Sequence, residues 1–403
     1  MSAALTRLRL GPARLHGSTL VLRLPRAADF PDWRRLRLRD RALLQPFWHT
    51  SPLDWDTRHS ERRWVRECLE AATNARTGRR VATVIEVDGR FAGQVEIGNI
   101  DPHTRQGEMG IWIDARLGRL GFGGVAAGSI LDFGFDTLGL ERIIAPISPA
   151  NAAATHGARQ LGFIREGRMV RRYDVGGARI DHDLWSMTRA ELPPKGFTEM
   201  WIERTLARGT DPTPPPEPLP RHSPGRALAL SVAARYRAGQ VWRIGQRMLP
   251  PAPVTLPLTG HPGAVLRTPD RHRLEFPFGT RPSSTTESLR LHLDLAGVPA
   301  GDAWILELDL FDRTARIQFR ADPAHADDDV RTAATRALLA YAFEELDLFR
   351  ISTAVAAGDT ASAAVAARAG LHKEATMRSY TGIDGHFGDH DLWAVTADGD
   401  HDA

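Results

Sequence analysis

The sequence predicts an α/β protein with two mixed-sheet domains in tandem, the second of them degenerate and truncated. The pentapeptide Asp-His-Asp-Leu-Trp occurs twice, at residues 181–185 and 389–393. The offset of 208 between the two pentapeptides also aligns apolar and glycine positions of residues 131–188 with those of 339–396, without a gap. Strand-like and helix-like runs alternate within each copy. These observations indicate that a whole supersecondary unit was duplicated.

Size and composition fit two cytoplasmic domains. The chain has 403 residues, of which 42% are hydrophobic and 25% are charged. The single cysteine, Cys68, excludes an internal disulfide and favours a reducing compartment. We expect no membrane span, because no apolar run reaches 18 residues, and no signal peptide at the N-terminus. With 52 basic and 49 acidic residues, nucleic acid is not expected as a direct partner.

The first domain is predicted over residues 15–200. Residues 81–100 read as a hairpin around Asp88-Gly89, and residues 107–114 as a strand. Helices are predicted over 128–140 and 151–163, with strands over 142–148 and 181–188. A proline-rich linker over 208–225 separates this domain from a second one over 226–400, which a helix precedes.

A glycine-rich loop between a strand and a helix is the feature that points to chemistry. Gly118, Gly121, Gly123 and Gly124 follow the strand at 107–114. Glycine lets the backbone approach a ligand closely, and the N–H groups at a helix start favour an anion such as a pyrophosphate. A flexible glycine turn without a ligand is the alternative.

The order strand, Gly-x-x-Gly-x-Gly loop, helix, strand, then "NAAATHGARQLGFIREG", resembles the GCN5-related N-acetyltransferase (GNAT) superfamily. The stretch "LVLRLPRAADFPDWRRLRLRDRALLQPFWHTSP" is similar to its RimJ/RimL branch, which acetylates N-termini of ribosomal proteins. The resemblance implies that acetyl-CoA is the co-substrate and that Gly118 stands where the family has Arg or Gln. The cofactor-binding residues that it implies are Ile111, Trp112, Ile113, Gly118, Arg119, Leu120, Gly121, Phe122, Gly123, Gly124 and Asn151. An aspartate at Gly121 should then abolish acetyl-CoA binding and leave the fold intact.

The resemblance also implies direct acetyl transfer to an amine within a ternary complex, which requires a base. The usual acid positions of the family hold Ala158 and Ala154 here. The catalytic candidates are therefore Glu108, acting as base through a water, and Tyr173, with Glu96 as a further carboxylate. No metal is expected.

The second copy has lost the loop. At the same offset, Gly118, Gly121, Gly123 and Gly124 correspond to Ala326, Asp329, Arg331 and Thr332, and Asn151 corresponds to Asp359. Asp327, Asp328 and Asp329 would repel a pyrophosphate and suit the helix dipole without a ligand. We expect a non-catalytic pseudoenzyme domain, and hence a structural role for the pentapeptide that survives in it.

The sequence therefore predicts an acyltransferase whose acceptor is a peptide or protein N-terminus. A small-molecule amine acetyltransferase and a non-enzymatic acetyl-CoA-binding or scaffold protein are the alternatives. Ribosomal substrates are the expected route to any contact with nucleic acid. The sequence leaves open whether the protein is a monomer or a dimer.

Overall fold

The computed structural model describes residues 5, 7–102, 104–209, 213–214, 224–247, 253–268, 287–322, 324–381 and 387–399. Its chain divides into two compact units. Unit 1 comprises residues 1–165, 175–178 and 184–247, and unit 2 comprises residues 166–174, 179–183 and 248–403. Most of the predicted linker lies outside the described residues.

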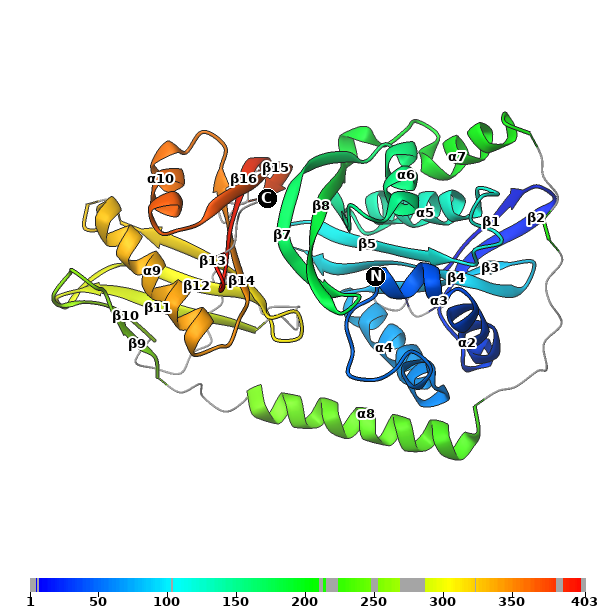
Figure 1. Cartoon of the computed structure of the whole chain (residues 1–403), viewed down its shortest axis with the longest axis horizontal. Coiled ribbons are helices and arrows are strands. Elements are labelled where there is room, and N and C mark those ends of the chain that lie inside the picture. Colours follow the sequence, from blue (N-terminus) through cyan, green and yellow to red (C-terminus); the bar gives the residue numbers. More distant parts are fainter. Residues whose placement is uncertain are drawn as a thin grey trace. The chain divides into compact units, whose positions relative to one another are not determined.

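Unit 1 is a mixed sheet with helices on both faces (Figure 1). The strand order is β1-β2-β3-β4-β5-β6-β8-β7. Helices α5, α6 and α7 cover one face, and α2 and α4 cover the other (Figure 1). The bounds are β1 (Arg9–Leu15), β2 (Ser18–Arg23), α2 (Phe30–Arg39), α3 (Arg41–Leu44), α4 (Glu61–Thr77), β3 (Val81–Val87), β4 (Arg90–Asp101), β5 (Gln106–Ile113), α5 (Phe122–Asp132), β6 (Arg142–Ile147), α6 (Ala152–Leu161), β7 (Ile164–Val175), β8 (Ala178–Thr188), α7 (Gly196–Leu206) and α8 (Arg226–Arg247).

Unit 2 repeats the strand and helix order of the duplicated segment. The strand order is β15-β16-β14-β13-β12-β11-β10-β9. Before α9, the described residues of the second copy contain strands only, whereas unit 1 has helices α2, α3 and α4 before β3. The bounds are β9 (Thr255–Pro257), β10 (Ala264–Arg267), β11 (Glu287–Leu295), β12 (Val298–Asp309), β13 (Thr314–Ala321), α9 (Asp328–Glu344), β14 (Arg350–Ala356), α10 (Thr360–Arg368), β15 (His372–Thr381) and β16 (Phe387–Thr396).

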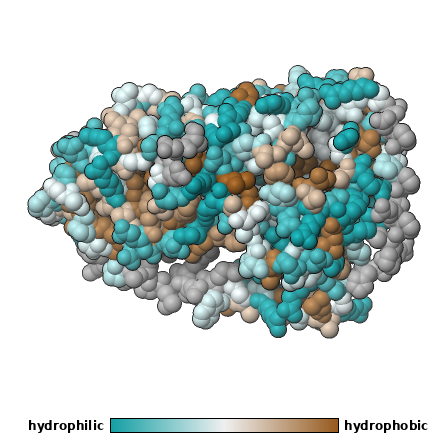
Figure 2. Space-filling view, in the orientation of Figure 1, coloured by the Kyte–Doolittle hydropathy of each residue, from teal (hydrophilic) through white to brown (hydrophobic). Residues whose placement is uncertain are grey.

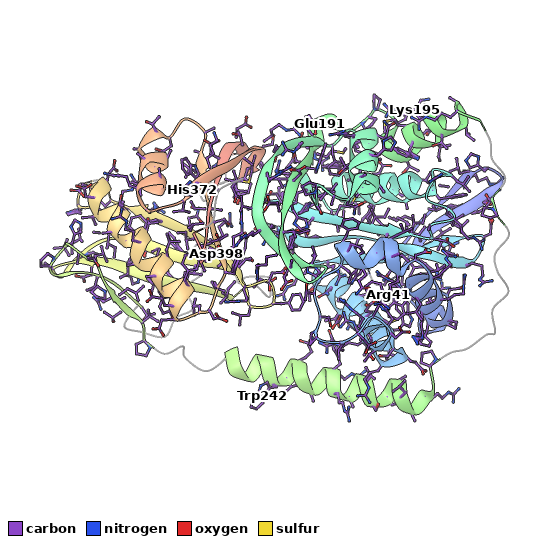
Figure 3. The ribbon with its side chains drawn as sticks, in the orientation of Figure 1. Arg41, Glu191, Lys195, Trp242, His372 and Asp398 are labelled. Atoms are coloured by element: carbon purple, nitrogen blue, oxygen red, sulfur yellow. The ribbon has the colours of Figure 1, made fainter. Side chains whose placement is uncertain are left out.

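The units differ from the predicted domains 15–200 and 226–400 at their edges. Strand β1 pairs with β2, so the sheet of unit 1 begins before residue 15. Helix α8 packs on α4 and therefore belongs to unit 1. On its free side Trp242 is 68% exposed and projects into solvent (Figure 3).

Hydrophilic residues predominate on the visible surface, with apolar residues interspersed (Figure 2). The described helices include none that is both long enough and apolar enough to span a bilayer.

The repeated pentapeptide has a structural role in both copies. Asp181 accepts a hydrogen bond from the backbone N–H of Arg171 (3.0 Å), and Asp389 accepts one from Ser379 (3.2 Å). Arg171 and Ser379 both have left-handed backbones, with φ of 46° and 48°. A carboxylate that binds the N–H of such a residue stabilises a conformation that non-glycine residues rarely adopt. The pentapeptide thus fixes an irregular point on the neighbouring strand.

Two glycines of the predicted ligand loop form the contact surface for α7. A Cβ atom on Gly124 would lie 1.8 Å from the Trp201 ring, and one on Gly121 would lie 2.7 Å from Cγ2 of Thr205. The indole Nε1 of Trp201 donates to the Gly121 carbonyl at 2.9 Å. Helix α7 therefore sits against the backbone of α5, where any larger residue would displace it.

Replacement of Gly124 by alanine should destabilise the protein, because its methyl group would overlap Trp201. We expect a loss of roughly 1–3 kcal/mol, typical of an overpacked core. Gly123→Ala is the matched control, since a Cβ there meets only Ile113, at 3.6 Å. It should be neutral or stabilise by up to about 1 kcal/mol. Urea unfolding of both variants measures the difference, and equal stabilities would contradict the proposed seat for α7.

Candidate active site

The site begins where strand β5 loses one of its two neighbours. Strand β5 pairs with β4 along its whole length, from Gln106 to Ile113. Its parallel pairing with β6 covers only residues 106–108. In the described part of the chain, no strand pairs with the β6-facing edge of residues 109–113. Alternate N–H and C=O groups along that edge are therefore available to a ligand.

The predicted residues Ile111, Trp112 and Ile113 lie in this open-edged segment. Ile111 is 39% exposed, which is unusual for an isoleucine inside a sheet strand. Trp112 points to the opposite face, where it is buried against Phe91 with ring centroids 5.8 Å apart. The backbone of this segment can serve a ligand, whereas the Trp112 side chain belongs to the core below α2.

A buried ion network fixes the loop that follows β5. Arg39 donates to Asp40 (2.7 Å) and to Asp114 (2.6 Å), and both carboxylates are buried. These hydrogen bonds, the one to Asp40 above all, raise the pKa of Arg39. Asp114 and Asp40 in turn accept the backbone N–H groups of Arg116 (2.8 Å) and Ala115 (3.1 Å). The loop therefore leaves the strand in one fixed direction.

The glycine loop ends at the start of α5. Gly118 and Arg119 are exposed, and the carbonyl of Leu120 bonds the His16 ring at 2.9 Å. Phe122 and Gly123 are the first helical residues, so their N–H groups have no intrahelical acceptor. Such groups, together with the helix dipole, are suited to an anion.

The loop glycines do not share one role. Cβ atoms on Gly118 and Gly123 would meet no atom closer than 3.6 Å, so a methyl group fits at both positions. Gly121 has φ of 86°, and it contacts α7 as described above. The expectation that Gly121→Asp would leave the fold intact is therefore wrong. The side chain of Phe122 is fully buried in the core and contributes only its backbone.

The predicted base, Glu108, lies at the end of β5 that still pairs with β6, opposite Ile144. Asn99 donates to its carboxylate at 3.2 Å.

The further carboxylate, Glu96 on β4, pairs with Gly110, which belongs to the open-edged segment of β5. A Cβ on Gly110 would be 3.6 Å from Cγ of Glu96, so the absent side chain leaves this carboxylate facing the β5 backbone. Arg80 donates to Glu96 from Nε at 3.0 Å.

The other predicted site residues have local partners. Asn151 caps α6, its side-chain oxygen accepting the Ala154 N–H at 3.1 Å. Tyr173 is buried in the part of β7 that belongs to unit 2, edge-on to His182 with ring centroids 5.1 Å apart. The roles of Asn151 and Tyr173 toward substrates stay predictions.

One residue that sequence reasoning missed is Arg37 on α2. It is buried between the rings of Trp48 and Trp112, with its guanidinium carbon 3.7 and 3.9 Å from their centroids. The sequence feature that indicates its burial is helical spacing. Arg37 follows the buried Trp33 by one turn and therefore lies on the same helix face.

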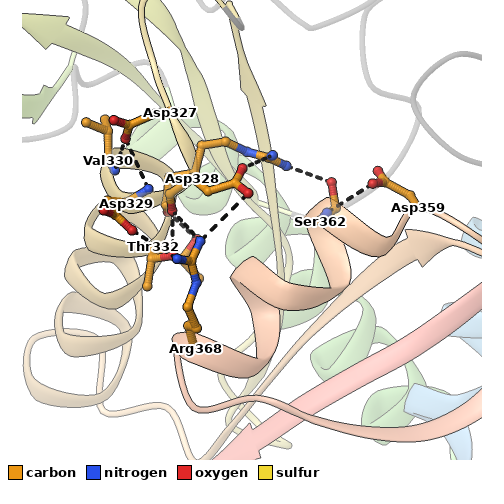
Figure 4. A network of polar contacts seen from close by, with 10 residues as sticks. Asp327, Asp328, Asp329, Val330, Thr332, Asp359, Ser362 and Arg368 are labelled. Carbon is orange, nitrogen blue, oxygen red and sulfur yellow. Dashed lines mark hydrogen bonds and ion pairs between the residues drawn. The ribbon is translucent and has the colours of Figure 1, made fainter.

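In unit 2 the first helical N–H groups are already occupied (Figure 4). Asp327 accepts the N–H groups of Asp329 (3.0 Å) and Val330 (2.9 Å). Arg331 pairs with Asp328 and Arg368 with Asp329, each at 2.9 Å. The expected capping of this helix start by its own acidic residues is present. The described residues of both units contain no cluster of three or more His, Cys, Asp or Glu suited to a metal ion.

An acetyltransferase (GNAT) domain model matches residues 19–164 and 281–372, more than half of the chain. Spermidine N(1)-acetyltransferase of Escherichia coli K12 is 33% identical over 94 residues, which is 23% of this chain and 50% of that protein. The putative ribosomal N-acetyltransferase YdaF of Bacillus subtilis is 33% identical over 104 residues, 26% of this chain and 57% of that protein. The chain thus spans about half the length of these curated relatives. A solved structure of Mycobacterium smegmatis RimJ in complex with CoA-disulfide is 32% identical, with 51% of this chain and 96% of that one covered and a TM-score of 0.46.

An aspartate at Gly118 should weaken acetyl-CoA binding, because it brings a negative charge to the exposed loop that would hold the pyrophosphate. Gly118→Ala is the matched control, since it adds the same Cβ without the charge. We expect a loss of roughly tenfold or more in affinity for Gly118→Asp, equivalent to one unfavourable charge contact. Titration calorimetry with acetyl-CoA measures it. Equal affinities of the two variants would exclude this loop from the pyrophosphate site.

Proposed function

The chain belongs to the acetyltransferase (GNAT) family, whose acyl donor is acetyl-CoA, and on that premise we propose that unit 1 acetylates the N-terminal amino group of a peptide or protein. The observation that carries the proposal is the open edge of residues 109–113 beside the glycine loop. It combines free backbone groups, a helix start suited to an anion and a facing carboxylate, Glu96. Sequence similarity to the putative ribosomal N-acetyltransferase YdaF supports a protein acceptor.

The proposed reaction is a direct transfer. The acceptor nitrogen attacks the thioester carbonyl carbon, the new C–N bond forms, and the C–S bond to CoA breaks. The excess proton on nitrogen passes to a base, and the CoA thiolate takes up a proton. A backbone N–H of residues 109–113 would stabilise the negative charge on the carbonyl oxygen.

We assign the base to Glu96, through a water, in preference to Glu108. Glu96 faces Gly110 within the open segment, whereas Glu108 lies two residues away, roughly 7 Å along the strand. Both carboxylates lie on the same face of the sheet, because successive side chains of a strand alternate.

A polyamine is the second candidate acceptor, since spermidine N(1)-acetyltransferase is one of the relatives. The carboxylates of Glu96 and Glu67, which both act electrostatically on Arg37, would suit a cation. The two acceptors are distinguished by turnover of a peptide amide and of spermidine by the same preparation.

Replacement of Glu96 by glutamine should lower kcat by roughly 100-fold or more, as expected for loss of a general base. The affinity for acetyl-CoA should not change, because Glu96 lies away from the loop. Glu108→Gln is the matched control on the neighbouring strand and should lose far less. A larger loss for Glu108→Gln would return the role of base to Glu108.

We also propose that unit 2 is non-catalytic and binds no acetyl-CoA. Asp327 occupies the N–H groups of Asp329 and Val330, and the carboxylates of Asp328 and Asp329 are paired with Arg331 and Arg368, so the helix start is satisfied without a ligand.

Calorimetric titration of the whole chain should therefore give one acetyl-CoA site per chain. In the Gly118→Asp variant that single site should weaken, which assigns it to unit 1. A second site of similar affinity that persists in this variant would refute the silent second unit.

A further inference from the structure

Arg37 is a buried cation that the folded protein satisfies only in part. Arg37 is 3% exposed, and the ring centroids of Trp48 and Trp112 lie 3.7 and 3.9 Å from its guanidinium carbon. Burial lowers its pKa to about 9. A charged group in such a place is costly unless its donors are bound.

The donors of Arg37 are mostly unbound. Nη2 donates to the side-chain oxygen of Gln94 at 3.2 Å. Nε and Nη1 have no hydrogen-bond partner among the described residues, although both are shielded from solvent. The N–H groups of a guanidinium lie along its planar edge, and the two indole contacts leave those of Nε and Nη1 without an acceptor in the described part of the chain. That planar edge matches a carbonyl or carboxylate oxygen.

The position of Arg37 relates it to the open strand edge. Gln94, its acceptor, pairs across the sheet with Trp112, and Glu96 pairs with Gly110. The two pairs are adjacent on one face of the sheet, roughly 7 Å apart along the strand. A group bound at Glu96 and one bound at Arg37 can thus belong to one small molecule.

We infer that Arg37 is a specificity-determining residue that donates from Nε and Nη1 to a carbonyl oxygen of the acceptor, next to the amine that is acetylated. This inference rests on the proposed function and narrows its acceptor. In a peptide N-terminus the carbonyl carbon lies two bonds from the amine nitrogen, whereas a polyamine has no oxygen and carries further positive charges. Arg37 therefore favours the peptide and disfavours the polyamine.

The charges around Arg37 suit an acceptor that has both an amine and a carbonyl group. The carboxylates of Glu67 and Glu96 act on Arg37 from α4 and β4, and Arg58 opposes them. Burial also raises the pKa of Glu67. Trp48, which contacts Arg37, is half-buried, whereas Trp33, Trp55 and Trp64 are core residues at most 2% exposed.

The test compares Arg37→Met with Arg34→Met, a control on the same helix whose side chain is 36% exposed. Tri-alanine amide and spermidine are the two acceptors, with the full chain and saturating acetyl-CoA. Arg37→Met should lower kcat/KM for tri-alanine amide by roughly 10- to 100-fold, the loss expected for hydrogen bonds from a charged donor. It should leave kcat/KM for spermidine equal or higher, and Arg34→Met should change neither.

Equal losses on both acceptors, or no loss on tri-alanine amide, would overturn the role of Arg37. If Arg37→Met does not fold, Arg37→Lys keeps the charge and stem but lacks the planar edge, and it should still raise KM for the peptide. An unchanged KM in that variant would overturn the inference as well. If the wild-type protein acetylates spermidine and not the peptide amide, the proposed acceptor and the inference both fall, a failure visible before any variant is made.

Discussion

The early end of pairing between β5 and β6 is the constraint on which the rest of unit 1 depends. A strand edge inside a fold needs partners for its N–H and C=O groups, and among the described elements residues 109–113 find a pairing strand on the β4 side only. Strand β4 pairs with β5, and the ion pairs of Arg39 fix the loop that follows β5. Helix α7 packs against α5 at Gly124. These contacts fix the elements next to the open edge. A ligand backbone that adds to it completes the hydrogen bonding that the sheet leaves unfinished.

Comparison of the two copies separates residues that maintain the fold from residues that serve a ligand. Asn151 and its counterpart Asp359 both cap a helix with a side-chain oxygen, so the change of residue preserves the cap. Asp181 and Asp389 likewise hold equivalent irregular backbones. Gly118 and Gly123 of the glycine loop make no comparable contact within the fold. In the second copy the loop is replaced by residues whose own side chains bind the N–H groups at the helix start. The second copy keeps the side chains that hydrogen-bond the protein's own backbone, whereas it lacks the glycines that would serve only a ligand.

Much of this could be predicted from the sequence, because repeats, hairpins and glycine loops are local patterns. The turn at Asp88-Gly89, the tandem mixed sheets confirmed by the two family matches, and the loss of the loop in the second copy all follow from them. The double role of the glycines could not be predicted, since Gly121 and Gly124 meet residues of α7 about 80 positions later in the chain. Helical spacing places Arg37 on the same face as Trp33, but its contacts with Trp48 and Trp112 arise only in the tertiary fold. Charge on a helix reads as solvent-facing until the packing is known.

The partial satisfaction of Arg37 also bears on the chemistry of the acceptor. An amine must lose its proton before it can attack a thioester, and an ammonium group near a buried cation loses that proton more readily. An acceptor held by Arg37 through its carbonyl would bring its amine close to that cation and to Glu96 together. The arginine would then lower the cost of deprotonation while the carboxylate receives the proton. The same buried charge would thus select an acceptor with a carbonyl group and favour deprotonation of its amine. These two roles would explain why an arginine is buried among tryptophans despite the free-energy cost of desolvation.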